Sequence, residues 1–443
     1  MDEKLAKKIL QTKKYSNIKN LIINDLIQKK QKPENTPLKI VMLNAPCHGN
    51  GDIMFAIKLY TYLKEWYNAD IKILTTQPKV FKNLGFADMD SIVALQTGEE
   101  TIQCRKFSDL IIYDKKNKKI LENIDYDVIF VAPLNRDFDP KLSDVKNLIP
   151  TANSLNTYFF SEYNDDPDKG FDFPTGVGGD NMGMMFTYKK NDVYEKPKNL
   201  PNPYSMIYIT DPDHDENAVH CYESFLQMLT KAIKVPKLDV VIPNWIAEDI
   251  LENGIPKGID PFYQTIRVTT DSYTKDLSEG KNILNFRADI FPVSNKEMKN
   301  IIKYSVRYIL VTGDQSITDV LNCCYNDALP FYQVVSWKED FAKNLGKYLP
   351  QKYIANIDTA CGTMKAITYK PDFSQFMKKQ DFRINARPKL DAVLYLSSSN
   401  DIPLYFMKKA YLSSKNGTSF VRKYQKFIRI YLNKLEEEKR MAN

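Results

Sequence analysis

Residues 307–321 read RYILVTGDQSITDVL. The apolar run 308–312 is typical of a short buried strand. A turn of small and polar residues follows at 313–316, and helical periodicity then begins at Ile317. The stretch therefore predicts a strand, a tight turn and a helix in direct succession.

Such a turn exposes unpaired backbone N–H groups, and the helix dipole adds partial positive charge at the same point. Phosphate and diphosphate groups bind at such places. Asp314 and Ser316 are also ordinary residues for starting a helix, so helix capping alone is the alternative explanation.

Length and composition limit the possibilities. With 443 residues the chain is long enough for two domains, each with its own core. Its 62 basic and 55 acidic residues are interspersed, a balance that suits an anionic small molecule and does not by itself indicate nucleic acid. No apolar run reaches ~20 residues and no signal-peptide pattern is seen, so neither a membrane span nor secretion is expected.

The cysteines and histidines argue for a cytoplasmic protein without a histidine-rich metal site. Six cysteines form no CxxC pair, which is typical of reduced thiols in the cytoplasm. Three histidines are too few for a histidine-rich site. Asp211 and Asp213, in the loop sequence DPDHDEN, are the alternative place for Mg²⁺ or Mn²⁺. A solvated loop that caps a helix is the favoured interpretation of that loop.

Alternation of apolar strands with amphipathic helices predicts two successive α/β units. The sequence NDVYEKPKNLPNP at 191–203 is the best linker between them. Four parts follow: a basic helical extension (1–36), an N-terminal Rossmann-like domain (37–195), a C-terminal Rossmann-like domain (204–372) and C-terminal helices that pack back across the domains (373–443).

The first unit opens with a strand, LKIVMLN (38–44), a loop, APCHGNGD (45–52), and a strongly periodic helix. Glycine in this loop lets a ligand approach the backbone, and Asp52 is expected to cap the helix. The loop is not GxGxxG, which disfavours a dinucleotide site. A second glycine-rich segment at 173–183 has no strand leading into it and is expected to be a mobile loop.

In the second unit, Ser294 and Glu297 have the spacing of a capping box at the start of a helix.

Two motifs carry a resemblance to a known family. HGNGD at 48–52 is similar to the glycine-rich loop of GT-B glycosyltransferases. The pattern from Ser294 to Tyr332, SNKEM…IIKYSVRYILVTGDQSITDVL…LPFY, is similar to their donor-binding half. The resemblance implies an α/β fold of two doubly wound parallel-sheet domains that face each other across a cleft. Bacterial arginine rhamnosyltransferases are a more distant likeness, and Gln315 stands where their turn carries an acid.

The resemblance implies roles for particular residues. The diphosphate of a donor would bind at the turn, with Arg287 as a cationic partner. Asp52 and His48 compete as the general base for the acceptor, with Asp52 preferred. Tyr332 and Phe331, on a loop expected at 329–345 after the central helix, would stack on the base or ribose. The expected donor-binding set is Gly51, Gly313, Asp314, Gln315, Ser316, Ile317 and Arg287.

The function expected from the sequence is transfer of a sugar from a nucleoside diphosphate sugar to a glycan or protein acceptor, with no metal required. A sugar-nucleotide epimerase of the same fold is one alternative, and a non-catalytic scaffold is another, because the fold alone does not fix the reaction.

Overall fold

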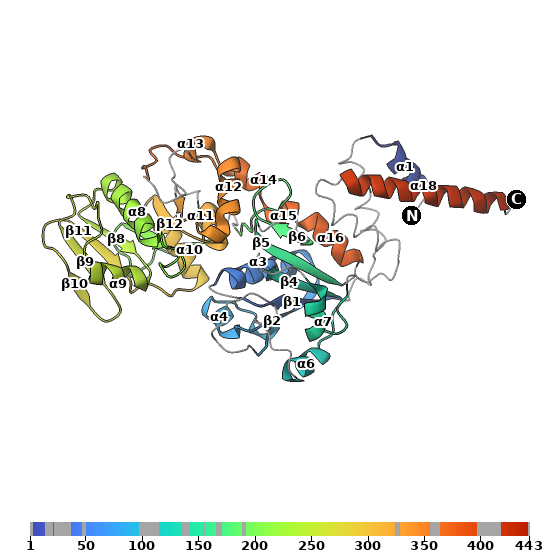
Figure 1. The fold of residues 1–443 in the computed structure, drawn as a ribbon, viewed down its shortest axis with the longest axis horizontal. Helices are drawn as coiled ribbons and strands as arrows, with labels where there is room; N and C mark the ends of the chain where they lie inside the picture. Colours follow the sequence, from blue (N-terminus) through green and yellow to red (C-terminus); the bar gives the residue numbers. More distant parts are fainter. Residues whose placement is uncertain are drawn as a thin grey trace.

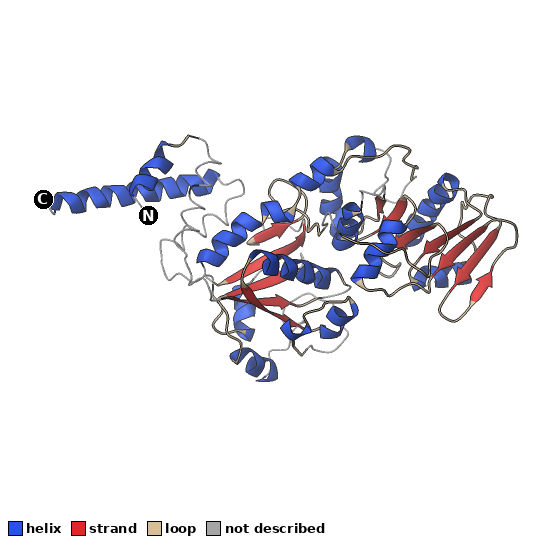
Figure 2. Ribbon diagram, turned by 180° about the vertical axis from the view of Figure 1, so that it is seen from behind, coloured by secondary structure: helices blue, strands red, loops and turns tan. Residues whose placement is uncertain are grey.

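The computed structural model describes most of the chain, namely residues 3–13, 21, 37–46, 50–96, 115–134, 141–153, 156–164, 171–187, 192–323, 328–354, 364–396 and 418–441. Two parallel sheets flanked by helices form its body (Figure 1), which confirms the expected α/β fold class. Figure 2 shows both sheets from behind, with helices packed on them.

The first sheet is six-stranded and parallel, in the order β3-β2-β1-β4-β5-β6. Its strands are β1 (Leu38–Asn44), β2 (Ala69–Thr75), β3 (Ile92–Ala94), β4 (Val128–Leu134), β5 (Thr157–Tyr163) and β6 (Phe173–Thr175). Every residue of β4 is buried, as expected of a central strand covered on both faces. The helices are α3 (Gly51–Trp66), α4 (Pro78–Asn83), α6 (Lys115–Glu122) and α7 (Leu142–Leu148).

The second sheet is seven-stranded, in the order β10-β9-β11-β8-β7-β12-β13, and is parallel except for the edge strand β10. Its strands are β7 (Tyr204–Tyr208), β8 (Lys237–Val241), β9 (Thr265–Thr269), β10 (Thr274–Asp276), β11 (Ile283–Arg287), β12 (Tyr308–Val311) and β13 (Leu329–Tyr332). The helices are α8 (Ala218–Ala232), α9 (Asn244–Asn253), α10 (Asn295–Tyr304), α11 (Asp314–Asn322), α12 (Glu339–Tyr348) and α13 (Gln351–Ile354). The capping box of Ser294 and Glu297 is present at the start of α10.

The remaining helices are α14 (Ser374–Lys379), α15 (Phe382–Asn385), α16 (Arg387–Leu396), α1 (Glu3–Gln11) and α18 (Thr418–Met441). After the second sheet the chain returns to the first domain, where Phe382 stacks on Tyr62 of α3. Helices α1 and α18 pack on each other away from both sheets (Figure 1). None of the described helices is long and apolar enough to cross a membrane.

The strand order of each sheet reverses next to the strand that comes first in the chain. In the first sheet the reversal falls between β1 and β4, and in the second between β7 and β12. Open α/β sheets bind ligands outside the carboxyl ends of the strands at such a reversal. The loops that follow β1, β7 and β12 are therefore the places to look for a site.

The segment 173–183 is not the mobile loop that the sequence predicts. It contains strand β6, and Val177 and Met182 are fully buried. The next residue, Met184, donates its backbone N–H to the carbonyl of Gln380 at 2.6 Å. The glycines of this segment serve close packing, because a methyl group at Gly183 would lie 2.3 Å from that same carbonyl oxygen.

We therefore predict that Gly183→Ala lowers the free energy of unfolding by about 1–3 kcal/mol, since φ at this position is +88° and the added carbon has no room. Gly179→Ala is the control, because nothing lies within 4 Å of its added carbon. Urea denaturation measures both. Equal, small effects of the two substitutions would show that the segment is not packed in solution.

Candidate functional site

Helix α11 begins at the carboxyl end of β12, beside the strand reversal of the second sheet. Its first residue is Asp314, three positions earlier than the sequence predicts, and Gly313 occupies the N-cap position with φ of +82°. Neither Asp314 nor Ser316 is the cap. Nothing lies within 4 Å of the place where a side chain at Gly313 would start, so the backbone of the turn is open to close approach by a ligand.

The loop after β7 lies on the other side of this reversal and is tied to the turn by one buried residue, Gln333. Gln333, directly after β13, accepts from the backbone N–H of Thr210 at 2.9 Å and donates to Asp215 at 2.7 Å. The backbone carbonyl of Gln333 accepts from the hydroxyl of Thr312 at 3.2 Å. The ends of β7, β12 and β13 are thus held as one polar edge.

The first domain meets this edge at the end of β5. Asp314 Oδ2 accepts from the backbone N–H of Tyr163 at 3.0 Å and from Lys338 Nζ at 3.0 Å. The same ammonium group lies 2.6 Å from Glu162 Oε2. The buried ammonium group of Lys338 lies beside the start of α11 and therefore contacts two carboxylates, one from each domain.

These groups have shifted pKa values. Burial raises the pKa of the Asp314 carboxyl, and the Lys338 ammonium opposes that shift. For Lys338, burial alone would lower the pKa, but Asp314 and Glu162 outweigh it and keep the pKa well above its usual value. The lysine therefore stays charged at neutral pH.

A second buried ion pair joins the two domains further along the same helix. Lys58 Nζ of α3 lies 2.7 Å from Asp319 Oδ1 of α11, and their side chains are 2% and 8% exposed. Burial lowers the pKa of Lys58, which Asp319 counteracts. The helix that follows β1 thus packs on the helix that follows β12, and the strand reversals of the two sheets are brought to one interface.

Removal of one partner of this pair should destabilise the protein more than removal of both. Lys58→Met leaves the Asp319 carboxylate buried without its cation, at a cost of about 3–5 kcal/mol, whereas Lys58→Met combined with Asp319→Leu should recover most of it. Urea denaturation of the single and double variants measures the difference. Equal stability of the two variants would mean that the pair is solvated.

The loop after β1 contributes the start of α3. Asn50 occupies the N-cap position and Asp52 lies in the first turn, so Asp52 is not the expected cap. The side chain of Asn44 donates to the carbonyls of Asp52 and Ala132 at 3.1 and 3.0 Å, which fixes the helix start between β1 and β4. Gly51, like Gly313, has nothing within 4 Å of the place of a side chain. His48 lies outside the described residues.

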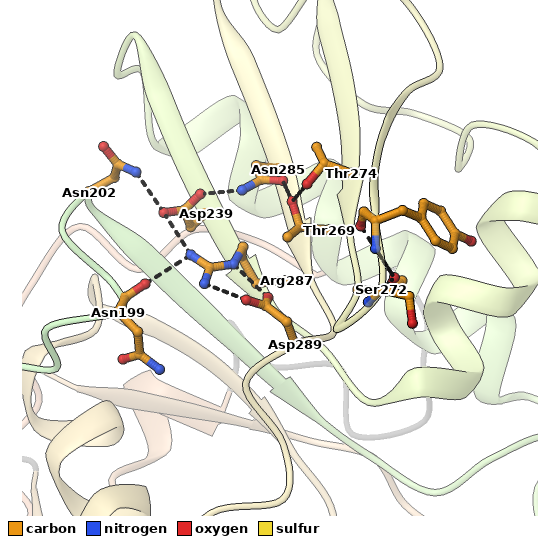
Figure 3. A network of polar contacts seen from close by, with 11 residues as sticks. Asn199, Asn202, Asp239, Thr269, Ser272, Thr274, Asn285, Arg287 and Asp289 are labelled. Carbon is orange, nitrogen blue, oxygen red and sulfur yellow. Dashed lines mark hydrogen bonds and ion pairs between the residues drawn. The ribbon is translucent and has the colours of Figure 1, made fainter.

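Arg287 lies away from the turn and has partners of its own (Figure 3). It ends β11, which is separated from β12 by β8 and β7, a distance of about 14 Å across the sheet. Its guanidinium donates two bonds of 2.7 Å to Asp289 and one of 3.0 Å to the Asn199 carbonyl. Asp239, which is fully buried, lies 3.9 Å away. Arg287 therefore joins the linker, at Asn199, to the second sheet.

We predict that Arg287→Lys lowers the free energy of unfolding by about 1–3 kcal/mol, because lysine lacks the fork that bonds both Asp289 oxygens. Arg267→Lys is the control. Its forked contact with Asp276 is more exposed and should be worth less than about 1 kcal/mol. If Arg287→Lys kept the stability of the wild type but bound nucleotide more weakly, Arg287 would instead be a ligand-binding residue.

The sequence predicts that Tyr332 and Phe331 lie on a loop, but in the structure they do not. They form the end of β13 and are 3% and 0% exposed. Phe331 packs against Phe225 and Tyr308, and Tyr332 packs against Phe341. Four successive buried residues suit a strand of a covered parallel sheet, so core packing accounts for both rings and leaves no exposed face for stacking.

The acidic loop after β7 does not assemble a metal site among the described residues, since no group of three or more His, Cys, Asp or Glu side chains is placed to hold an ion there or elsewhere in them. Asp211 Oδ1 forms a hydrogen bond of 2.7 Å with His214 Nδ1, and Asp213 is exposed.

Sequence reasoning missed Lys338, Glu162 and Gln333. The signal for Glu162 was present, because it is a polar residue at the end of an apolar run. For Lys338 and Gln333 the sequence predicts a loop at 329–345, whereas 329–332 form strand β13 and Gln333 follows the end of that strand.

Solved structures resemble this chain loosely. The glycosyltransferase SnogD from Streptomyces nogalater has a TM-score of 0.42 and 10% identity over 81% of this chain and 100% of its own. An α-glucosyltransferase in complex with UDP and a 13-mer DNA has a TM-score of 0.36 and 11% identity over 89% and 99%. A putative UDP-N-acetylglucosamine 2-epimerase from Listeria monocytogenes has a TM-score of 0.39 and 10% identity over 86% and 96%.

No family model and no curated protein matches the chain. The expected likeness to arginine rhamnosyltransferases is not shown by the three structures above. Scores this low carry no weight for the site, which rests on the geometry of the chain itself.

Proposed function

We propose that this protein is a glycosyltransferase that uses a nucleoside diphosphate sugar, with the diphosphate bound at the start of α11. The observation that carries the proposal is the placement of Gly313. It is an open glycine at a helix N-terminus, beside the strand reversal of the second sheet and facing the first domain. Backbone N–H groups of residues 313–316 and the Ser316 hydroxyl are the proposed ligands of the phosphate oxygens. The N–H of Ile317, which the sequence also suggests, donates to the Gly313 carbonyl at 3.3 Å.

Two buried oxygens beside this turn support a ligand that also carries hydroxyl groups. Among the described residues, Asp314 Oδ1 and Gln315 Oε1 are buried without a hydrogen-bond partner. Leaving such acceptors unpaired is costly, and sugar hydroxyl groups are donors that would satisfy them.

The proposed reaction breaks the bond between the anomeric carbon and the diphosphate oxygen, and the electron pair stays on that oxygen. The start of α11 stabilises the negative charge that develops there. The acceptor oxygen forms the new bond to the anomeric carbon, and its proton passes to a general base. Asp52, in the first turn of α3 at the reversal of the first sheet, is the proposed base.

Binding of the donor is tested with a thermal-shift panel of UDP, GDP, CDP, ADP and dTDP, each with Mg²⁺ and with EDTA. One nucleotide should raise the unfolding midpoint in both conditions, because a ligand of the folded state stabilises it by mass action. Ser316→Trp should abolish the shift by filling the turn.

Asp211→Asn/Asp213→Asn serves as the control and should keep the shift. A shift that requires metal and disappears in this double variant would instead place the donor at the loop after β7. No shift with any nucleotide would contradict the proposed function.

A further inference from the structure

Lys338 lies at the proposed diphosphate site, whereas Arg287 does not. Lys338 ends a short helical turn (Ser336–Lys338) that follows β13, the strand next to β12. The ammonium group is 3.0 Å from Asp314, the first residue of α11. The side chain of Lys338 is 8% exposed, so water screens its charge little.

The charges around this lysine do not balance. One ammonium group faces two carboxylates, Asp314 and Glu162, and a bound diphosphate would add further negative charge at the same helix end. Like charges this close in a buried site oppose each other strongly. Binding of the anion therefore favours an arrangement in which one carboxylate leaves the lysine.

Glu162 is the carboxylate that is free to leave. Asp314 keeps a second donor, the Tyr163 backbone N–H at 3.0 Å, and belongs to α11 itself. For the Glu162 side chain, Lys338 is the partner that the structure shows, and its side chain is somewhat more exposed, at 15% against 10% for Asp314. Glu162 also belongs to the first domain, at the end of β5.

We propose that Lys338 is the cation that binds the donor diphosphate and that Glu162 forms an ion pair with Lys338 when the donor is absent. Donor binding then replaces the Lys338–Glu162 contact between the domains with a contact between Lys338 and the diphosphate. Occupancy of the site is thereby linked to the packing of one domain on the other. This inference rests on the proposed function, because it assumes a diphosphate at the start of α11.

Lys58 and Asp319 provide a matched control. Their ion pair is also buried, also joins the two domains and also involves an aspartate of α11. Asp319 lies five residues beyond Asp314, away from the helix start. Loss of this pair changes the interface without changing the charge at the diphosphate site.

The experiment is isothermal titration of the full chain with inorganic pyrophosphate, with the nucleoside diphosphate that gives the largest thermal shift, and with its monophosphate. Glu162→Gln should tighten binding of both diphosphates about tenfold, because it removes a competing negative charge and keeps the size of the side chain. Lys338→Met should weaken binding of both about 10- to 100-fold, the usual effect of losing a charge-assisted hydrogen bond.

The monophosphate should respond less than the diphosphates to either substitution. Lys58→Met/Asp319→Leu should leave the affinity for pyrophosphate unchanged. Because Lys338→Met leaves two carboxylates without their cation and can unfold the protein, Glu162→Gln is the deciding variant.

Unchanged or weaker diphosphate binding by Glu162→Gln, in a protein whose wild type binds a nucleoside diphosphate, would overturn this inference and leave the proposed function in place. Equal tightening by Glu162→Gln and by Lys58→Met/Asp319→Leu would also overturn it, since loosening of the interface would then be the cause. Failure of the wild type to bind any nucleoside diphosphate would contradict the proposed function first. A response to pyrophosphate alone would identify a free diphosphate, and not a nucleotide, as the ligand.

Discussion

Two buried ion pairs beside α11 join the two domains and set how they approach each other. At the start of the helix Lys338 of the second domain pairs with Glu162 of the first, and further along it Lys58 of the first domain pairs with Asp319 of the second. Charges buried to this degree are costly unless each is paired with good geometry. The requirement restricts how the two sheets can approach each other, because a shift of either domain would leave a carboxylate or an ammonium group unpaired.

The same contacts explain why the candidate site lies where it does. Helices α3 and α11 both begin at strand reversals, where the carboxyl ends of neighbouring strands leave backbone groups without partners in the sheet. These helices pack on each other, and each begins at an open glycine, Gly51 and Gly313 respectively. Each domain supplies part of the polar environment at the start of α11, Glu162 from the first and Lys338 from the second.

The local elements could be predicted from the sequence, whereas their partners could not. Apolar runs such as 128–134 identify buried strands, and the spacing of Ser294 and Glu297 identifies a helix start, because both depend on neighbours in the chain. The pairing of Lys338 with Glu162 joins residues 176 positions apart and is set by tertiary packing. Arg287 shows the same limit, since nothing near it in sequence reveals that the Asn199 carbonyl takes one of its donors.

The proposed diphosphate site lies at the start of α11, next to the first domain. Hydrogen–deuterium exchange of the full chain with and without a saturating nucleoside diphosphate tests it most directly, since it reports which backbone amides the ligand covers. We predict slower exchange at residues 313–317, together with a change at the end of β5 around Glu162. Slower exchange confined to the region of Arg287 and Asp289, with 313–317 unaffected, would contradict the account.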